Sequence, residues 1–178
     1  MDEIRKMKTK LKIMFIYELE MKVRDYELDL QGIVNNSVYQ NYLEHTRHEF
    51  LLENNVSFDE LHKRGIDAVV ARIEMAFKAS LRSGDSFVSL LYVKKEGVKY
   101  VFHQEIRRKT DNLLCIKARV DTVAVINGKL ASALPEFDEL VDHAMVQPNI
   151  HWHIRCAQLI SPEQAVIHDG VTLGQTQP

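Results

Sequence analysis

The residues of this chain best suited to chemistry lie in one short polar segment. Residues 24–39 read Arg-Asp-Tyr-Glu-Leu-Asp-Leu-Gln-Gly-Ile-Val-Asn-Asn-Ser-Val-Tyr, with Asp29 near the middle. A carboxylate can attack a carbonyl or activate water, and acyl transfer also needs hydrogen-bond donors where negative charge grows on the carbonyl oxygen. Gly32 lets the backbone turn sharply, and a helix beginning near Asn36 would direct its free amides into the space that the loop encloses. The segment therefore predicts a carboxylate that faces an oxyanion donor.

Other interpretations of the polar residues stay open. Asp, Asn and Gly are the commonest loop residues, so Asp29 and its neighbours could simply hold a turn. Glu44 could reach a neighbouring subunit, although a helical glutamate usually pairs with a residue such as His48. His45 and His48 could suggest general-base chemistry, but no Ser or Cys nucleophile stands in a matching motif. His151-Trp152-His153 lacks a nearby third ligand, so no metal site is expected.

The elements around the segment follow from periodicity. Apolar and charged residues alternate strictly from Tyr17 to Arg24, which predicts a strand with one buried face. Ser37 can cap a helix of about four turns, because Val38, Tyr39, Tyr42, Leu43, Thr46 and Phe50 recur at helical spacing. Ser57 and Glu60 form a capping box before a shorter helix that Gly65 ends. The segment therefore joins a strand to a helix.

The rest of the predicted domain is rich in β-branched and aromatic residues. Four strands are expected, at Val69–Phe77, Phe87–Lys95, Tyr100–Arg108 and Leu113–Ile126. We expect hairpins to join neighbouring strands, and Asn127-Gly128 suits a two-residue turn because both positions tolerate positive φ. Residues 136–145 could form a short amphipathic helix. The helix from Ser37 is the only element long enough to cover the sheet, so we predict an α+β fold with an antiparallel sheet around it; periodicity also allows other α+β arrangements.

The polar segment resembles the active-site loop of the hydroxybenzoyl-CoA thioesterase family of hotdog proteins. The resemblance lies in Asp29, Gly32, Ile33-Val34, Asn35-Asn36 and Tyr39, and in the helix Tyr42-Leu43-Glu44-His45-Thr46-Arg47. It covers roughly residues 17–135. It implies a hotdog fold, in which an antiparallel sheet wraps around a long central helix, over residues 15–135. Residues 1–14 are then an N-terminal extension, and residues 136–178 an appendage of unknown role.

The same resemblance implies an acyl-CoA thioesterase that yields free acid and coenzyme A. Asp29 would act as nucleophile or general base, and the backbone amide of Asn36 would polarise the carbonyl. Many relatives carry an Asp where this chain has Glu27, so Glu27 is expected to support catalysis at most. Glu44, on the helix, is a second possible supporting residue. The expected substrate-binding residues are Gly32, Val34, Asn35, Tyr39 and Tyr42.

The resemblance also implies a homodimer or homotetramer with the active site at the subunit boundary and with no cofactor besides the coenzyme A of the substrate. Three alternatives stay open: an acyl carrier protein (ACP) thioesterase, a non-catalytic acyl-CoA-binding hotdog protein, and a hotdog dehydratase or hydratase. The dehydratase or hydratase is disfavoured because its expected loop histidine is missing here.

Composition limits the possible partners. The 178 residues are 46% hydrophobic, which suffices for one sizeable core. The formal charge of −2 gives no electrostatic basis for binding nucleic acid or a membrane surface. The start of the chain lacks the apolar run of a signal peptide, so a cytoplasmic protein is expected.

Overall fold

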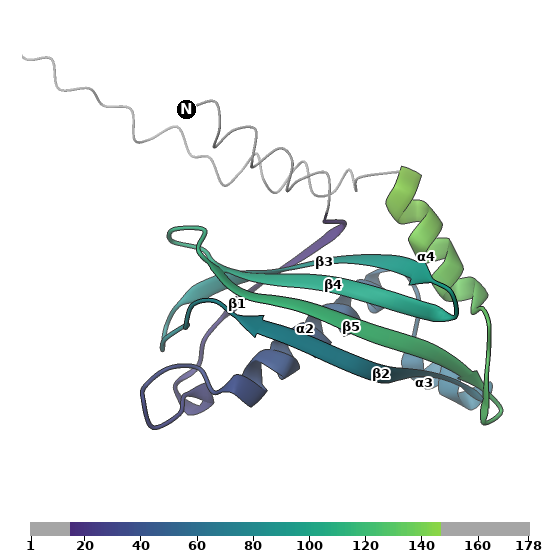
Figure 1. The fold of residues 1–178 in the computed structure, drawn as a ribbon, viewed down its shortest axis with the longest axis horizontal. Helices are drawn as coiled ribbons and strands as arrows, with labels where there is room; N and C mark the ends of the chain where they lie inside the picture. The colour runs from purple at the N-terminus through teal and green to yellow at the C-terminus, as the bar shows by residue number, and fades with distance from the viewer. Residues whose placement is uncertain (1–14, 147–178) are drawn as a thin grey trace, which may run out of the picture. The chain divides into compact units, whose positions relative to one another are not determined.

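A computed structural model of the chain describes residues 15–146, with side chains as far as residue 141 (Figure 1). The predictions for residues 1–14, for residues 147–178 and for the histidines at 151 and 153 lie outside this part. The described elements are β1 (Tyr17–Lys22), the 3-10 helix η1 (Asp25–Glu27), α2 (Asn36–Glu53), α3 (Phe58–Lys63), β2 (Ile66–Phe77), β3 (Ser86–Glu96), β4 (Lys99–Arg108), β5 (Leu114–Ile126), β6 (Lys129–Leu130) and α4 (Pro135–Val146). The predicted α+β class and antiparallel sheet are confirmed.

The strands form one antiparallel sheet in the order β1-β3-β4-β5-β2, with β6 paired to β5. Hairpins join β3 to β4, β4 to β5 and β5 to β6, as predicted. The turn between β5 and β6 places Asn127 at φ 49° and Gly128 at φ 76°, as expected of that dipeptide. The expectation that hairpins join all neighbouring strands was wrong for β2. That strand pairs with β5, and residues 78–85 connect it to β3 on the far side of the sheet.

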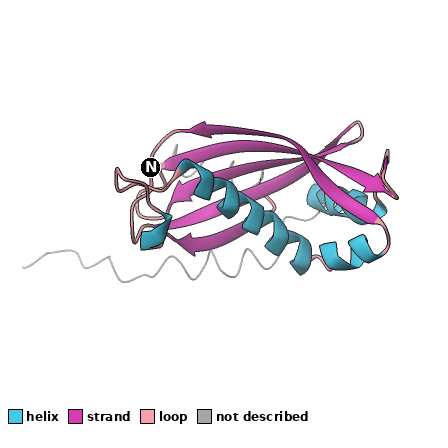
Figure 2. Ribbon diagram, turned by 90° about the horizontal axis from the view of Figure 1, so that it is seen from below, coloured by secondary structure: helices cyan, strands magenta, loops and turns pink. Residues whose placement is uncertain are grey.

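Helix α2 runs across one face of the sheet (Figure 2). The helix begins at Asn36, and its N-cap is Asn35, whose side-chain oxygen accepts a hydrogen bond from the amide of Ser37. The prediction that Ser37 caps the helix was therefore wrong by two residues. Asn is as good a cap as Ser, and the backbone of Asn35 is already held by the loop before it.

Two hydrophobic clusters hold α2 on the sheet. The first half of the helix contributes Tyr39, Tyr42 and Leu43 to one cluster, with Phe87 and Ile106 of the sheet. The second half contributes Phe50 and Leu51 to the other; its further members include Leu91, Tyr100, Phe102, Val120 and Phe137. Burial of these side chains is the main source of stabilisation.

Buried polar side chains lie at the middle of α2, between its contributions to the two clusters. Thr46 Oγ1 lies 2.8 Å from Ser89 Oγ on β3. Arg47 Nη1 donates to Gln104 Oε1 at 2.9 Å, and Gln104 Nε2 donates to the carbonyl oxygen of Leu43 at 2.9 Å. Burial lowers the pKa of the Arg47 guanidinium below its usual value. These bonds tie the helix to β3 and β4 by specific partners as well as by apolar contact.

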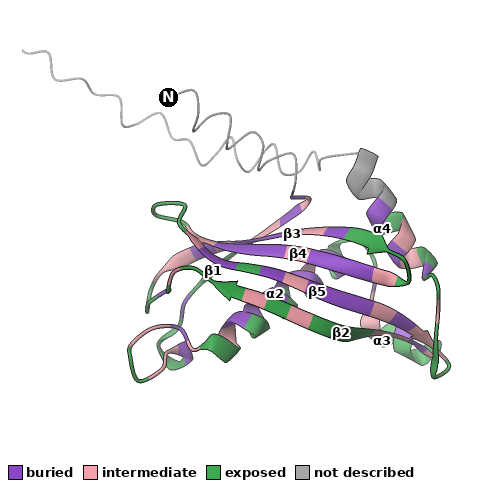
Figure 3. Ribbon diagram, in the orientation of Figure 1, coloured by how far each residue is buried: buried purple, intermediate pink, exposed green. Residues whose placement is uncertain are grey.

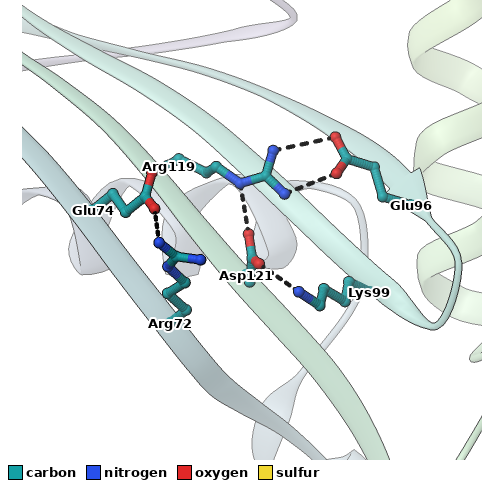
Figure 4. A network of polar contacts seen from close by, with 6 residues as sticks. All are labelled: Arg72, Glu74, Glu96, Lys99, Arg119 and Asp121. Atoms are coloured by element: carbon teal, nitrogen blue, oxygen red, sulfur yellow. Dashed lines mark hydrogen bonds and ion pairs between the residues drawn. The ribbon is translucent and has the colours of Figure 1, made fainter.

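Charged residues connect strands on the sheet (Figure 4). Arg119 on β5 pairs with Glu96 on β3 at 2.7 Å and with Asp121 at 2.9 Å, and Lys99 on β4 donates to Asp121 at 2.9 Å. Arg72 and Glu74 form a separate pair on β2. Asp121 is buried, so both of its cationic partners offset the cost of removing its charge from water.

Helix α4 belongs to the same core as the sheet. Phe137 is only 1% exposed and packs against Tyr100, whose hydroxyl accepts a bond from the amide of Leu134 and lies 2.7 Å from Asp138. Figure 3 colours much of β4 and β5 as buried and much of β2 as exposed. The core therefore extends beyond residue 135, where the sequence predicted the domain to end, because the apolar face of α4 completes it.

Candidate functional site

The predicted active-site segment folds into a closed loop between η1 and α2. Leu28 and Val34 form an isolated antiparallel bridge, which brings the two arms of the loop together. The carbonyl oxygen of Glu27 accepts the amide of Asn35 at 2.9 Å, and that of Ile33 accepts the amide of Asp29 at 2.8 Å. Asp29 thus lies on one arm of the loop, and the other arm leads directly into α2.

Glycine is required at the tip of this loop. Gly32 has a φ of +72°, a conformation that side-chain-bearing residues rarely adopt, and its amide donates to the carbonyl oxygen of Asp29 at 3.0 Å. No atom would obstruct an added Cβ. The role of Gly32 is therefore to close the turn, while its predicted contact with substrate stays a prediction.

The carboxylate of Asp29 is half-buried and held by its own loop. Its Oδ1 accepts the amide of Gln31 at 2.8 Å and that of Ile33 at 3.4 Å. Its Oδ2 has no hydrogen-bond partner among the described side chains of residues 15–141 or the described backbone of residues 15–146. One oxygen therefore fixes the orientation of the group, and the other is available to a bound molecule.

The start of α2 supplies a backbone donor beside the loop. The side chain of Asn35 accepts from Ser37, at 3.0 Å from its amide and 2.9 Å from its hydroxyl, so this Asn serves as a cap. The amide of Asn36 has no acceptor among the described residues, and Asn36 is exposed. A free first-turn amide at the positive end of a helix is suited to bind a developing negative charge.

Glu27 differs sharply from Asp29, although only one residue separates them. Its side chain is 7% exposed. Oε2 accepts the hydroxyl of Tyr42 at 2.5 Å and the amide of Arg24 at 2.7 Å, and Oε1 lies 3.3 Å from Arg24 Nη1. Both carboxylate oxygens are hydrogen-bonded, so Glu27 has a structural role: it connects η1 and Arg24 before it to α2 through Tyr42.

The two tyrosines predicted to bind substrate are buried. The hydroxyl of Tyr39 accepts the amide of Leu81 at 3.0 Å, and burial raises the pKa of this phenol. Burial, and then the hydrogen bond to Glu27, raise the pKa of Tyr42 far above the usual range. Both rings pack in the core cluster with Val34, so these three residues have packing roles, and their contact with substrate stays a prediction.

Glu44 lies away from the closed loop, on the exposed face of α2. Its Oε1 is 3.8 Å from His48 Nε2, and both side chains are about half exposed. This pairing of Glu44 with His48 is the usual arrangement of a helical glutamate, as expected from the sequence. A role for Glu44 within a single chain has no support from this placement.

Sequence reasoning missed one residue that supports the site. Leu81 is fully buried in the connection between β2 and β3; its amide donates to Tyr39, and its carbonyl oxygen accepts the amide of Val34 at 2.9 Å. It thereby braces the loop from a segment almost fifty residues away. The only signal is an apolar residue within a polar connection, which does not specify its partner.

The loop and helix start together supply what acyl transfer needs, namely a carboxylate with one available oxygen and a free amide donor. Among the side chains of residues 15–141, no group of three or more His, Cys, Asp or Glu could hold a metal ion. No helix in that part is long and apolar enough to cross a membrane.

Comparison with protein families gives a match that includes this loop. The model of the thioesterase-like superfamily matches residues 23–145, which is most of the chain and includes α4.

Two curated relatives from Arabidopsis thaliana match parts of the chain. Acyl-acyl carrier protein thioesterase ATL3, chloroplastic, is 50% identical over 72 residues, which are 40% of this chain and 38% of ATL3. ATL2, described in the same words, is 46% identical over 96 residues, which are 54% of this chain and 51% of ATL2. The matches thus span about half or less of the length of these relatives.

Among solved structures, Slr0204 from Synechocystis, a 1,4-dihydroxy-2-naphthoyl-CoA thioesterase, is similar to the chain with a TM-score of 0.67. The identity is 15%, and the match covers 71% of this chain and 95% of Slr0204. At that identity, the likeness shows a shared fold.

Proposed function

Because the chain belongs to the thioesterase-like superfamily, we propose that it hydrolyses an acyl-CoA to free acid and coenzyme A. The observation that carries this proposal is the closed loop, which holds Asp29 by one oxygen and leads directly into the helix with the free Asn36 amide. The narrower family predicted from the loop, that of the hydroxybenzoyl-CoA thioesterases, remains part of the proposal.

In the proposed reaction the thioester carbonyl accepts a hydrogen bond from the Asn36 amide while Asp29 acts from the other arm of the loop. As general base, Asp29 takes a proton from water, the resulting hydroxide adds to the carbonyl carbon, and the C–S bond breaks with the proton passing to the thiolate. As nucleophile, Asp29 adds to the carbon itself, the thiolate leaves, and water then hydrolyses the mixed anhydride. Both routes consume one water and need no cofactor.

We propose further that two copies assemble into the full hotdog arrangement, with each sheet wrapped around its long helix and the substrate at the boundary. The free edge of β2 supports this assembly. β2 has twelve residues and pairs only with β5 among the described strands, and Val69, Val70 and Phe77 on it are exposed. Long apolar edge strands are usually covered, because unpaired backbone groups recruit another strand.

The acyl carrier is the second open point. ATL3 and ATL2 are named as acyl-ACP thioesterases, and their identity to parts of this chain favours ACP as an alternative carrier to coenzyme A. Both are also named as chloroplastic, whereas we propose a cytoplasmic location for this chain. A non-catalytic acyl-CoA-binding protein is the remaining alternative.

A thiol-release assay tests the proposal. Short, long and aromatic acyl groups are offered on coenzyme A and on ACP, and free thiol is followed over time. We expect turnover with at least one substrate, and Asp29→Asn should lower kcat by about 10²- to 10⁴-fold, the range that acid–base catalysis spans.

Asp59→Asn is the matched control, because Asp59 lies on α3, is exposed and pairs with Lys63 on the same helix; its kcat should equal that of the wild type. An Asp29→Asn variant with full activity contradicts the role of Asp29. Binding of acyl-CoA without thiol release by the wild type supports the non-catalytic alternative instead.

A further inference from the structure

A buried hydrogen bond connects the loop to the body of α2. Tyr42 lies seven residues beyond the cap Asn35, which is about 10 Å along the helix axis. Its hydroxyl donates to Glu27 Oε2 at 2.5 Å, and both side chains are almost fully buried. The ring of Tyr42 packs on Phe87 with centroids 4.7 Å apart, which holds the hydroxyl at a fixed place above the sheet.

Glu27 is attached to the helix at two separate points. Its backbone oxygen accepts the amide of Asn35 at the helix start, and its carboxylate accepts Tyr42 further along. The same carboxylate oxygen accepts the amide of Arg24, which closes η1 behind it. Two attachments to one rigid helix define both the position and the orientation of Glu27, and Asp29 follows it by only two residues.

We infer that Glu27 and Tyr42 form a positioning clamp, which sets the placement of the Asp29 carboxylate relative to the free amide of Asn36. Glu27 touches neither substrate nor reacting atoms, because both of its oxygens are already bonded and it is buried. Its contribution is geometric. It is effective because acyl transfer is sensitive to displacements of about 1 Å in the reacting groups.

The clamp depends on the reach of the side chain, as well as on its charge. Aspartate keeps the charge but is one methylene shorter, so Glu27→Asp should lose the bond to Tyr42. Glutamine keeps the length and one oxygen acceptor, so Glu27→Gln should retain part of the clamp. Tyr42→Phe keeps the ring and removes only the donor.

The experiment compares these three variants with Tyr100→Phe as matched control. Tyr100 is also a buried tyrosine with a bonded hydroxyl, but it holds α4 and belongs to the other hydrophobic cluster. We expect Tyr42→Phe and Glu27→Asp to lower kcat about 10- to 100-fold with little change in KM. Glu27→Gln should retain more kcat than Glu27→Asp, and Tyr100→Phe should keep wild-type kcat.

Two further measurements separate positioning from simple destabilisation. The double variant Glu27→Asp/Tyr42→Phe should have a kcat no lower than that of the less active of the two single variants. Both changes break the same contact, so their effects should not add. Amide hydrogen exchange, followed by mass spectrometry on peptides from residues 24–36, should be faster in Tyr42→Phe and Glu27→Asp and unchanged in Tyr100→Phe.

The effect on kcat rests on the proposed function, whereas the exchange measurement does not. A wild-type chain that releases no thiol from any substrate overturns the proposed function, and faster exchange in the variants still supports the clamp. Unchanged exchange overturns the clamp, as does a Glu27→Asp variant more active than Glu27→Gln. Faster exchange with wild-type kcat overturns the catalytic importance of the positioning.

Discussion

At the scale of single residues, the folded environment distinguishes the carboxylates of Glu27 and Asp29. The sequence alone could not show which of them can contact a substrate. Glu27 is buried with both oxygens occupied, whereas Asp29 is half-buried with one oxygen available. Both are acidic residues of one short segment, Glu27 at the end of η1 and Asp29 in the loop after it, and only the folded geometry shows which of them can meet a ligand. Resemblance to a family gave Asp29 its predicted role, and the available oxygen is consistent with it.

Asn35 provides a test at this scale. Its side chain caps α2, so Asn35→Ala should lower the free energy of unfolding by about 1 kcal/mol, the usual cost of a lost cap. Asn35→Ser should restore most of that stability, because serine caps equally well. Urea denaturation monitored by circular dichroism measures both. A Ser variant as unstable as the Ala variant would show that Asn35 stabilises the loop by another contact.

At the scale of elements, most of the fold was predictable and the pairing of β2 was not. Alternation in residues 17–24, apolar spacing after Ser37 and the Asn127-Gly128 turn each specify local structure, and each predicted element is present. The partner of β2 depends on how residues 78–85 cross to β3, which leaves no local pattern. The same connection contains Leu81, so its hydrogen bonds to Tyr39 and Val34 could not be predicted from the sequence either.

The ion pairs between strands give a prediction about pH. Hydrogen bonds from Lys99 and Arg119 hold the pKa of Asp121 below its usual 3.8 in the folded chain, despite burial, which opposes this shift. A lowered folded-state pKa stabilises the fold above pH 3.8, and this contribution is lost as the pH falls through the folded-state value.

Asp121→Asn should therefore lower the free energy of unfolding by about 1–3 kcal/mol at pH 7, because this buried side chain loses its charge-assisted hydrogen bonds from Lys99 and Arg119. The difference from the wild type should shrink progressively below pH 3.8. Denaturant titrations at pH 7, 4, 3 and 2.5 measure it. A difference that stays constant over this series would exclude ionisation of Asp121 as its source.

At the scale of the whole molecule, the edge of β2 that faces away from β5 has no partner strand among residues 15–146. We expect the wild type to have twice the 20.6 kDa chain mass, or a higher multiple, by light scattering. The double variant Val69→Lys/Val70→Lys should be monomeric, because charges on an edge strand oppose pairing with another chain.

Leu130→Lys is the control for that variant. Leu130 is 63% exposed on β6, which pairs with β5 on the side opposite β2. Its oligomeric state should match the wild type. A monomeric wild type, or an unchanged mass in the double lysine variant, argues against assembly through this edge.

The bonds among Arg47, Gln104 and the carbonyl oxygen of Leu43 have a consequence for how the sequence can change. A helix held only by apolar contact could slide along the sheet at modest cost, whereas these bonds are satisfied in one alignment. Replacing either Arg47 or Gln104 alone by an apolar residue leaves a buried polar group without a hydrogen-bond partner. Substitutions at these two positions, 57 residues apart, should therefore be coupled, so that an apolar residue is accepted at one only when the other changes with it.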